Sequence, residues 1–277
     1  MKFALHRHTG HVLWALPDGR FCDLTRALGS LAPRSLLAAL CDFNLHAHLQ
    51  WLPLREDYCV PATTELACPL PNPNRILGIG RNYSEHAAEL GNHVPDEPVV
   101  FQKANSCIIG PLDAICIPDD LGRTDHEAEL LVIIGKDGHK IQLEDAMGYV
   151  AGYSIINDVT ARAKSKELQA KGYPWFLAKC RDTFAPIGPV VVTSAALNDA
   201  FPLDITLTVN GEVRQSGTTA AMVHSIASLI HFLSQATHLK AGDCIATGTP
   251  SGVGPLVPGD NVAITISGIG TLSNPVK

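Results

Sequence analysis

DHEAELLVIIGK, residues 125–136, is the stretch that decides the fold. Its apolar run, Leu130–Ile134, is short and ends at the turn-forming sequence of residues 135–138, which predicts a buried strand. Residues two apart in a strand point to the same face, so Glu127 and Glu129 would share a face with part of this run. Burying two unpaired carboxylates is costly, and a bound cation would remove that cost. The alternative is an exposed strand edge at which both carboxylates are solvated.

Strand signals dominate on both sides of this stretch. Residues 75–79 form a short apolar run, and DITLTVNGEVRQ (204–215) alternates around Asn210-Gly211, a strong hairpin signal. Residues 218–238 carry apolar side chains at helical spacing, and further strands are predicted within 243–272. Strands and helices do not alternate regularly. We therefore predict an α+β fold, a mainly β mixed sheet with few helices.

The first 70 residues predict a small separate α+β unit. The turn sequence Pro17-Asp18-Gly19 separates two short apolar runs, as in a hairpin, and a helix is predicted over residues 33–52. The connector CPLPNPNR (68–75) contains three prolines and marks a boundary. We predict two domains, residues 1–70 and residues 71–277.

Composition narrows the class of protein. The chain has 277 residues, of which 46% are hydrophobic, so it can form a large core without disulfides. A net charge of -6 at pH 7 argues against nucleic acid as a partner. The eight cysteines include no CxxC pair, which fits a reducing compartment. The first residues lack a signal peptide and the longest apolar run is too short for a bilayer. These features predict a cytoplasmic protein that binds no membrane.

A third carboxylate follows an apolar strand in GYSIINDVTAR (152–162). Asp158 at that strand end would complete a facial set with Glu127 and Glu129. Three carboxylates and water suit a hard cation, Mg²⁺ first, with Mn²⁺ or Ca²⁺ as alternatives. Asp158 as a helix N-cap is the ordinary alternative, and both roles can coexist. The hypothesis fails if the three carboxylates diverge or if a basic side chain occupies the space between them.

A histidine and a glutamate share one face of a predicted helix in NYSEHAAE (82–89). His86 and Glu89 are three residues apart and therefore adjacent on a helix. A carboxylate beside an imidazole raises its basicity, which suits a base that activates water. An ordinary surface pair is the alternative. The polar, proline-containing sequence that follows predicts that the pair lies on a lid over residues 90–100.

Two further segments are candidates for the site. Lys179 lies in the apolar context WFLAKCRDTF (175–184), and its alternative is a surface lysine with a buried stem. The glycine-rich ATGTPSGVG (246–254) offers backbone amides and hydroxyls that can bind a carboxylate. A plain turn is the alternative for that loop.

Six segments in this order and spacing resemble the fumarylacetoacetate hydrolase family. They are GRNYSEHAAE (80–89), FQKANSCIIGP (101–111), DHEAELLVIIGK (125–136), GYSIINDVTAR (152–162), KCRDTFAPIGP (179–189) and ATGTPSGVG (246–254). The resemblance covers residues 75–277. It implies a mainly β catalytic domain, often preceded by a small N-terminal domain, and a homodimer.

The resemblance also implies roles for individual residues. It gives metal ligands at Glu127, Glu129 and Asp158, a water-activating pair at His86 and Glu89, a catalytic lysine at Lys179, and substrate-binding positions at Tyr83, Arg162, Ser165 and Thr249. Family members that act as acylpyruvases or oxaloacetate decarboxylases carry an acid and a glutamine where Ala163 and Ser165 stand here. This departure counts against decarboxylation of oxaloacetate and indicates a different or larger substrate.

The activity implied by the resemblance is metal-dependent hydrolysis of a carbon–carbon bond. The substrate would be a small anionic 2,4-diketo acid of the acylpyruvate or fumarylpyruvate type, cleaved through a metal-stabilised enolate. Within the family, the alternatives are a 2-oxo acid decarboxylase, an isomerase or tautomerase, or a hydratase of aromatic or sugar-acid catabolism. From another class, the alternative is a metal-dependent binding module without catalysis.

Overall fold

The computed structural model of the protein describes residues 1–89, 91 and 95–277. The lid predicted over residues 90–100 therefore lies partly outside the described residues. Within them, no helix combines the length and the apolar character needed to cross a membrane.

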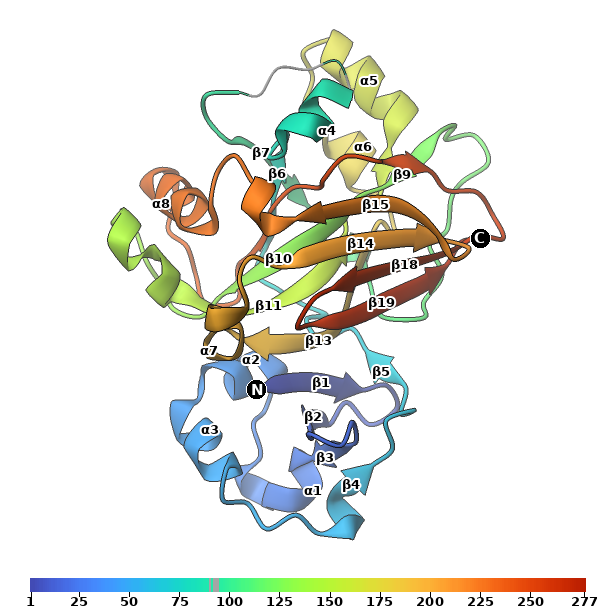
Figure 1. Cartoon of the computed structure of the whole chain (residues 1–277). Coiled ribbons are helices and arrows are strands. Elements are labelled where there is room, and N and C mark those ends of the chain that lie inside the picture. Colours follow the sequence, from blue (N-terminus) through green and yellow to red (C-terminus); the bar gives the residue numbers. More distant parts are fainter. Residues whose placement is uncertain (90, 92–94) are drawn as a thin grey trace.

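One twelve-stranded mixed sheet runs through the whole molecule (Figure 1). Ten strands follow in the order β4 (Cys59–Val60), β3 (Phe21–Asp23), β2 (Val12–Ala15), β1 (Lys2–His6), β13 (Ala185–Thr193), β11 (Val150–Asn157), β10 (Ala128–Ile134), β16 (Cys244–Ala246), β6 (Ile76–Gly80) and β7 (Val99–Lys103). Two short strands join at the side: β5 (Leu66–Ala67) pairs with β1, and β8 (Ile108–Ile109) pairs with β13. The predicted mixed-sheet fold is confirmed.

A second, four-stranded antiparallel sheet packs over β10 and β11. Its order is β15 (Glu212–Thr218), β14 (Asp204–Val209), β18 (Asn261–Ile266) and β19 (Gly270–Pro275). The turn between β14 and β15 is the predicted Asn210-Gly211, and both residues have positive φ (53° and 82°). Alternate residues of β14 are buried against the main sheet, as expected for a half-exposed strand. A small third sheet contains β12 (Thr160–Ala161), β9 (Thr124–His126) and β17 (Gly254–Pro255).

The helices are shorter than the sequence predicted. They are α1 (Leu24–Leu28), α2 (Leu36–Cys41), α3 (Phe43–Leu49), α4 (Ser84–Glu89), α5 (Arg162–Ala170), α6 (Phe176–Lys179), α7 (Ser194–Leu197) and α8 (Ile226–Ala236). The helix predicted over 33–52 is two helices, because the Asp42 side chain caps α3 by accepting from the Leu45 amide at 2.9 Å. The helix predicted over 218–238 begins only at Ile226, where Ser225 is the N-cap.

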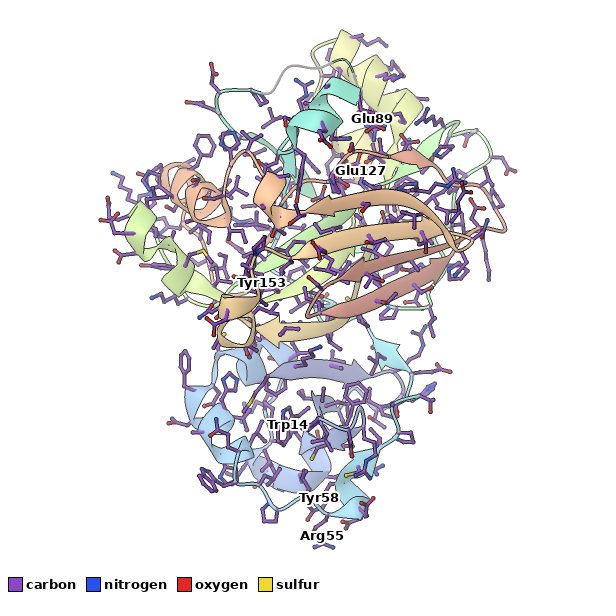
Figure 2. All side chains as sticks on the ribbon, in the orientation of Figure 1. Trp14, Arg55, Tyr58, Glu89, Glu127 and Tyr153 are labelled. Carbon is purple, nitrogen blue, oxygen red and sulfur yellow. The ribbon has the colours of Figure 1, made fainter. Side chains whose placement is uncertain are left out.

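The N-terminal unit is joined to the rest of the chain by main-chain pairing. Strand β1 pairs with β13 in an antiparallel register, with Phe3 opposite Val191. Phe3 is fully buried in one cluster with Val191 and Ile133. Figure 1 shows the unit at one end of the molecule, and Figure 2 shows Glu89 and Glu127 near the opposite end. The boundary at residue 70 stays a prediction.

Candidate metal centre

Three buried carboxylates converge at one point in the part of the chain that follows residue 75. Glu127 lies between β9 and β10, Glu129 lies in β10, and Asp158 follows β11. The segments are held together because the Asp158 amide donates to the Glu127 carbonyl oxygen (2.9 Å) and the Glu127 amide donates to Asn157 Oδ1 (3.0 Å). One oxygen of each carboxylate lies within 4.8 Å of the others, and all three side chains are buried. The solvated strand edge is therefore wrong, and Asp158 is not a helix N-cap, since Ala161 precedes α5.

Two buried lysines neutralise part of this charge. Lys179 Nζ donates to Glu127 Oε2 (2.8 Å) and also to Asp158 Oδ2. Lys103 Nζ donates to Asp158 Oδ1 (2.7 Å) and to the Lys179 carbonyl oxygen (2.7 Å), and Lys103 has no exposed surface. The exposed surface lysine considered for residue 179 is therefore wrong. Lys103 is a site residue that local sequence patterns did not predict.

Arg162 is ion-paired both with Glu127 of the cluster and with Asp125. Its guanidinium donates to Glu127 through Nη2 and to Asp125 Oδ2 (2.8 Å) through Nε. Burial alone would raise the pKa of Glu127, but the charges of Lys179 and Arg162 lower it below its ordinary value. Glu127 is therefore ionised at neutral pH.

Glu129 is the carboxylate that the protein leaves uncompensated. Among the described residues it has no basic side chain within ion-pair distance, and its hydrogen bond comes from the Gly248 amide (2.8 Å). Burial, followed by the charges of Asp158 and Glu127, raises the pKa of Glu129 well above its ordinary value. The Lys179 ammonium thus lies between two of the three carboxylates, Glu127 and Asp158, but forms no ion pair with Glu129, and all three carboxylates still line one hollow. Three buried carboxylates with one unbalanced charge fit a hard divalent cation.

We expect divalent cation binding to strengthen as pH rises. The pKa of Glu129 is raised in the metal-free folded protein, so the folded state keeps a proton at pH values where the unfolded state has already released it. Raising the pH above the ordinary pKa of a glutamate therefore lowers the free energy of unfolding. A cation displaces that proton. Titration calorimetry with Mn²⁺ in two buffers of different ionisation enthalpy should show proton release. No proton release at any pH from 5 to about 8 would contradict the assignment.

His86 and Glu89 lie on α4 beside this cluster. The imidazole is buried, and burial lowers the pKa of His86 despite the nearby carboxylates. His86 Nδ1 is 3.4 Å from Glu89 Oε2, and Glu89 also accepts from the Gly252 amide (3.1 Å). The surface pair is therefore wrong for His86. A neutral imidazole oriented by a carboxylate is suited to take up a proton.

The glycine-rich loop predicted to bind a carboxylate does so within the protein. Its Gly248 and Gly252 amides hold Glu129 and Glu89, which fixes the loop between the metal cluster and α4. Thr249 Oγ1 accepts from Gln215 Nε2 (2.7 Å).

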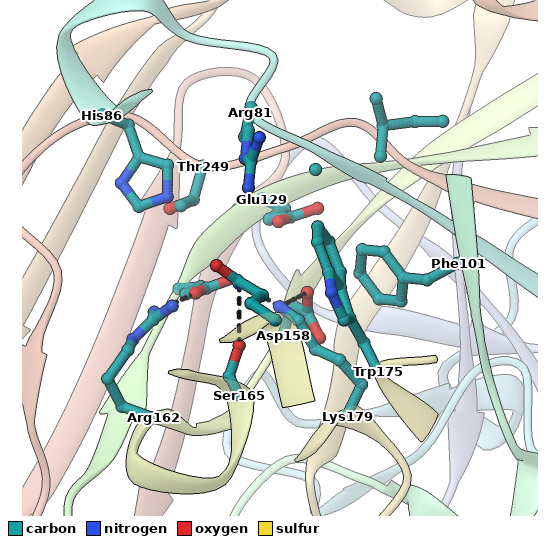
Figure 3. A pocket seen from close by; sticks show the side chains of 14 residues that line it. Arg81, His86, Phe101, Glu129, Asp158, Arg162, Ser165, Trp175, Lys179 and Thr249 are labelled. Carbon is teal, nitrogen blue, oxygen red and sulfur yellow. Dashed lines mark hydrogen bonds and ion pairs between the residues drawn. The ribbon is translucent and has the colours of Figure 1, made fainter. Parts of the chain in front are cut away.

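One pocket joins the three carboxylates to His86 and Lys179 (Figure 3), whereas Glu89 lines a separate hollow. It is a small hollow that is partly open to solvent. It is lined by Ile79, Gly80, Arg81, His86, Phe101, Glu127, Glu129, Asp158, Arg162, Ser165, Gln169, Trp175, Lys179 and Thr249. Of the predicted substrate-binding residues, Arg162, Ser165 and Thr249 line it. Tyr83 is buried and lines a neighbouring hollow instead.

Several lining residues were not identified from the sequence. Phe101 lines the pocket, whereas Lys103 contacts Asp158 without lining it. Both belong to FQKANSCIIGP (101–111), and a lysine at the end of an apolar strand was a usable signal. Arg81 precedes the predicted helix, whereas Gln169 and Trp175 have no local pattern that indicates a site.

Known proteins resemble this chain in sequence and in structure. The family model described as fumarylacetoacetate (FAA) hydrolase C-terminal matches residues 75–277. The oxaloacetate tautomerase YisK of Bacillus subtilis is 43% identical over the whole of both chains. A fumarylacetoacetate hydrolase structure from Exiguobacterium antarcticum has a TM-score of 0.83 and 35% identity, covering 100% of this chain and 99% of that one. A fumarylpyruvate hydrolase structure from Pseudomonas aeruginosa, in complex with Mn²⁺ and pyruvate, has a TM-score of 0.71 and 33% identity, covering 76% and 91%.

Proposed function

The chain belongs to the fumarylacetoacetate hydrolase family, and from that premise we propose that it is a divalent-metal-dependent tautomerase. Its substrate would be a small 2-oxo acid of the oxaloacetate type, whose keto and enol forms it interconverts. The observation that carries the proposal is the neutral, buried imidazole of His86 beside a carboxylate cluster in which Glu129 has no basic partner among the described residues. The full-length relative named as an oxaloacetate tautomerase supports this reaction ahead of the hydrolysis expected from the sequence.

The metal would be held by Glu127, Glu129 and Asp158. A divalent cation bound there supplies positive charge that draws electrons from a 2-oxo acid and lowers the cost of forming its enolate. Mg²⁺ and Mn²⁺ are the candidates, and Mn²⁺ is supported by the Pseudomonas aeruginosa structure. The homodimer implied by the resemblance stays a prediction.

His86 and Lys179 have different roles in this reaction. His86 takes a proton from the carbon next to the keto group and delivers it to the former keto oxygen, which gives the enol; the opposite transfer gives the keto form. The Lys179 ammonium, whose pKa is raised by Asp158 and Glu127 although burial alone would lower it, stays charged and offsets negative charge on the enol oxygen. Neither step consumes water or breaks a carbon–carbon bond, so substrate and product have the same composition.

Hydrolysis of a diketo acid remains the second candidate. The pair His86 and Glu89 favours it, because an imidazole hydrogen-bonded to a carboxylate can deprotonate a water molecule. Hydrolysis of acetylpyruvate would release acetate and pyruvate, whereas tautomerisation releases neither.

The test is enol decay measured by stopped-flow absorbance with oxaloacetate and Mn²⁺, together with product analysis on acetylpyruvate. We expect fast ketonisation by the wild type, no acetate, and a loss of about 10²–10⁴-fold in His86→Asn. Cation affinity should be unchanged in His86→Asn, because His86 does not belong to the carboxylate cluster. If the protein released acetate from acetylpyruvate and did not accelerate the ketonisation of oxaloacetate, it would be a hydrolase and not a tautomerase.

A further inference from the structure

The guanidinium of Arg81 lies in the pocket without an acidic partner. Arg81 follows β6 and is half-buried, and among the described residues no carboxylate lies within ion-pair distance of it. Its guanidinium carbon is 5.9 Å from the centroid of the Trp175 ring. Figure 3 shows Arg81 pointing into the space above Glu129, with Trp175 beside it. A cation stacked on an aromatic ring keeps its N–H donors free for a ligand.

The backbone holds Arg81 in an unfavourable conformation. Its φ is 61°, a region that non-glycine residues rarely adopt. The next residue, Asn82, is fully buried and anchors the turn, because Nδ2 donates to the Thr247 carbonyl oxygen (2.8 Å) and Oδ1 accepts from the His224 amide (2.8 Å). Strain fixed by such contacts is found where a side chain must be aimed at a ligand.

Two glycines make room for the aromatic wall behind Arg81. A Cβ at Gly78 would lie 2.3 Å from the Phe101 ring, and a Cβ at Gly80 would lie 2.9 Å from the Trp175 ring. The two rings are in contact, with centroids 5.8 Å apart. This wall reduces the access of water to one side of the guanidinium, which strengthens its attraction for an anion.

We infer that Arg81, supported by Trp175, binds the second carboxylate of a dicarboxylic 2-oxo acid. The inference rests on the proposed function, in which the other end of the acid lies at the carboxylate cluster. A guanidinium can bind a carboxylate through two parallel hydrogen bonds. The Gln169 side chain, which donates to Ser165 Oγ (3.2 Å), lines the same pocket and adds an amide to its polar surface. A monocarboxylic acid would leave Arg81 without a partner, so the site selects dicarboxylates.

The experiment compares malate and lactate, which share a 2-hydroxy acid end and differ by the distal carboxylate. Titration calorimetry with the Mn²⁺-loaded protein should show tighter binding of malate than of lactate. Arg81→Met should weaken malate binding at least about tenfold and change lactate binding less than about twofold. Arg81→Lys should lose less, because it keeps the charge but not the paired donors.

Arg181→Met is the matched control. It removes the same charge from a residue just beyond α6 that does not line the pocket, and it should change neither affinity. Equal affinities for malate and lactate in the wild type, or equal weakening of both ligands by Arg81→Met, would overturn the inference. The binding experiment does not depend on turnover. A protein that prefers malate but does not ketonise oxaloacetate would contradict the proposed tautomerase activity and leave the role of Arg81 intact.

Discussion

Glu129→Gln is expected to abolish divalent cation binding while leaving the metal-free protein at least as stable as the wild type. Glutamine has the shape of glutamate and can still accept from the Gly248 amide, but it carries no negative charge. Burial and the charges of Asp158 and Glu127 disfavour the ionised form of Glu129 in the metal-free protein, so a neutral glutamine of the same shape avoids that cost. The same change replaces one of the three anionic ligands of the cation by a neutral amide.

Two measurements check this pair of effects. Mn²⁺ should raise the thermal midpoint of the wild type and not that of Glu129→Gln, and ketonisation of oxaloacetate should fall about 10³-fold or more, since the cation supplies several kcal/mol of stabilisation. Glu167→Gln is the control, because it makes the same chemical change at an exposed residue bonded to Lys164 and Lys171. If Mn²⁺ still raised the thermal midpoint of Glu129→Gln, Glu129 would not be a metal ligand.

Lys103→Met is expected to cost about 3–5 kcal/mol of unfolding free energy, the largest stability effect in the site. The Lys103 ammonium is fully buried and bonds Asp158 and the carbonyl oxygens of Val159 and Lys179. Methionine fills a similar volume but donates nothing, so the Asp158 carboxylate loses one of its two cations and the carbonyl oxygens lose a donor.

Urea unfolding of the metal-free protein measures this cost. Lys171→Met is the control, since Lys171 pairs with Glu167 at the surface, where solvent screens the pair, and its loss should change stability much less. If Lys103→Met lost no more stability than Lys171→Met, the buried lysine would be unimportant for holding Asp158.

The strands and the pair Glu127 and Glu129 could be predicted because they depend on local spacing, whereas Asp158 was added because it follows a second apolar strand. The alternation in β14 and the apolar run of β10 are visible in the sequence, and the carboxylates at 127, 129 and 158 stand beside such runs. The helix ends were less predictable, because a capping side chain such as Asp42 interrupts a continuous apolar pattern.

The residues that complete the site could not be predicted by spacing. Lys103 contacts Asp158, which is 55 positions away, and Arg81 meets Trp175 only through the pairing of β6 and β7 and the packing of α6 on β7. A glutamine also enters the pocket at position 169, one helical turn beyond Ser165. The absence of glutamine at position 165 is therefore a weaker argument against oxaloacetate than the sequence suggested.

The pairing of β1 with β13 has a consequence for any shortened version of this protein. Removing residues 1–70 would leave the main-chain amides and carbonyls opposite Lys2 and Phe3 without partners. It would also expose Val191 and its apolar neighbours along the same edge. Such an open edge invites pairing between molecules, so a catalytic half prepared alone would tend to self-associate even with every site residue intact.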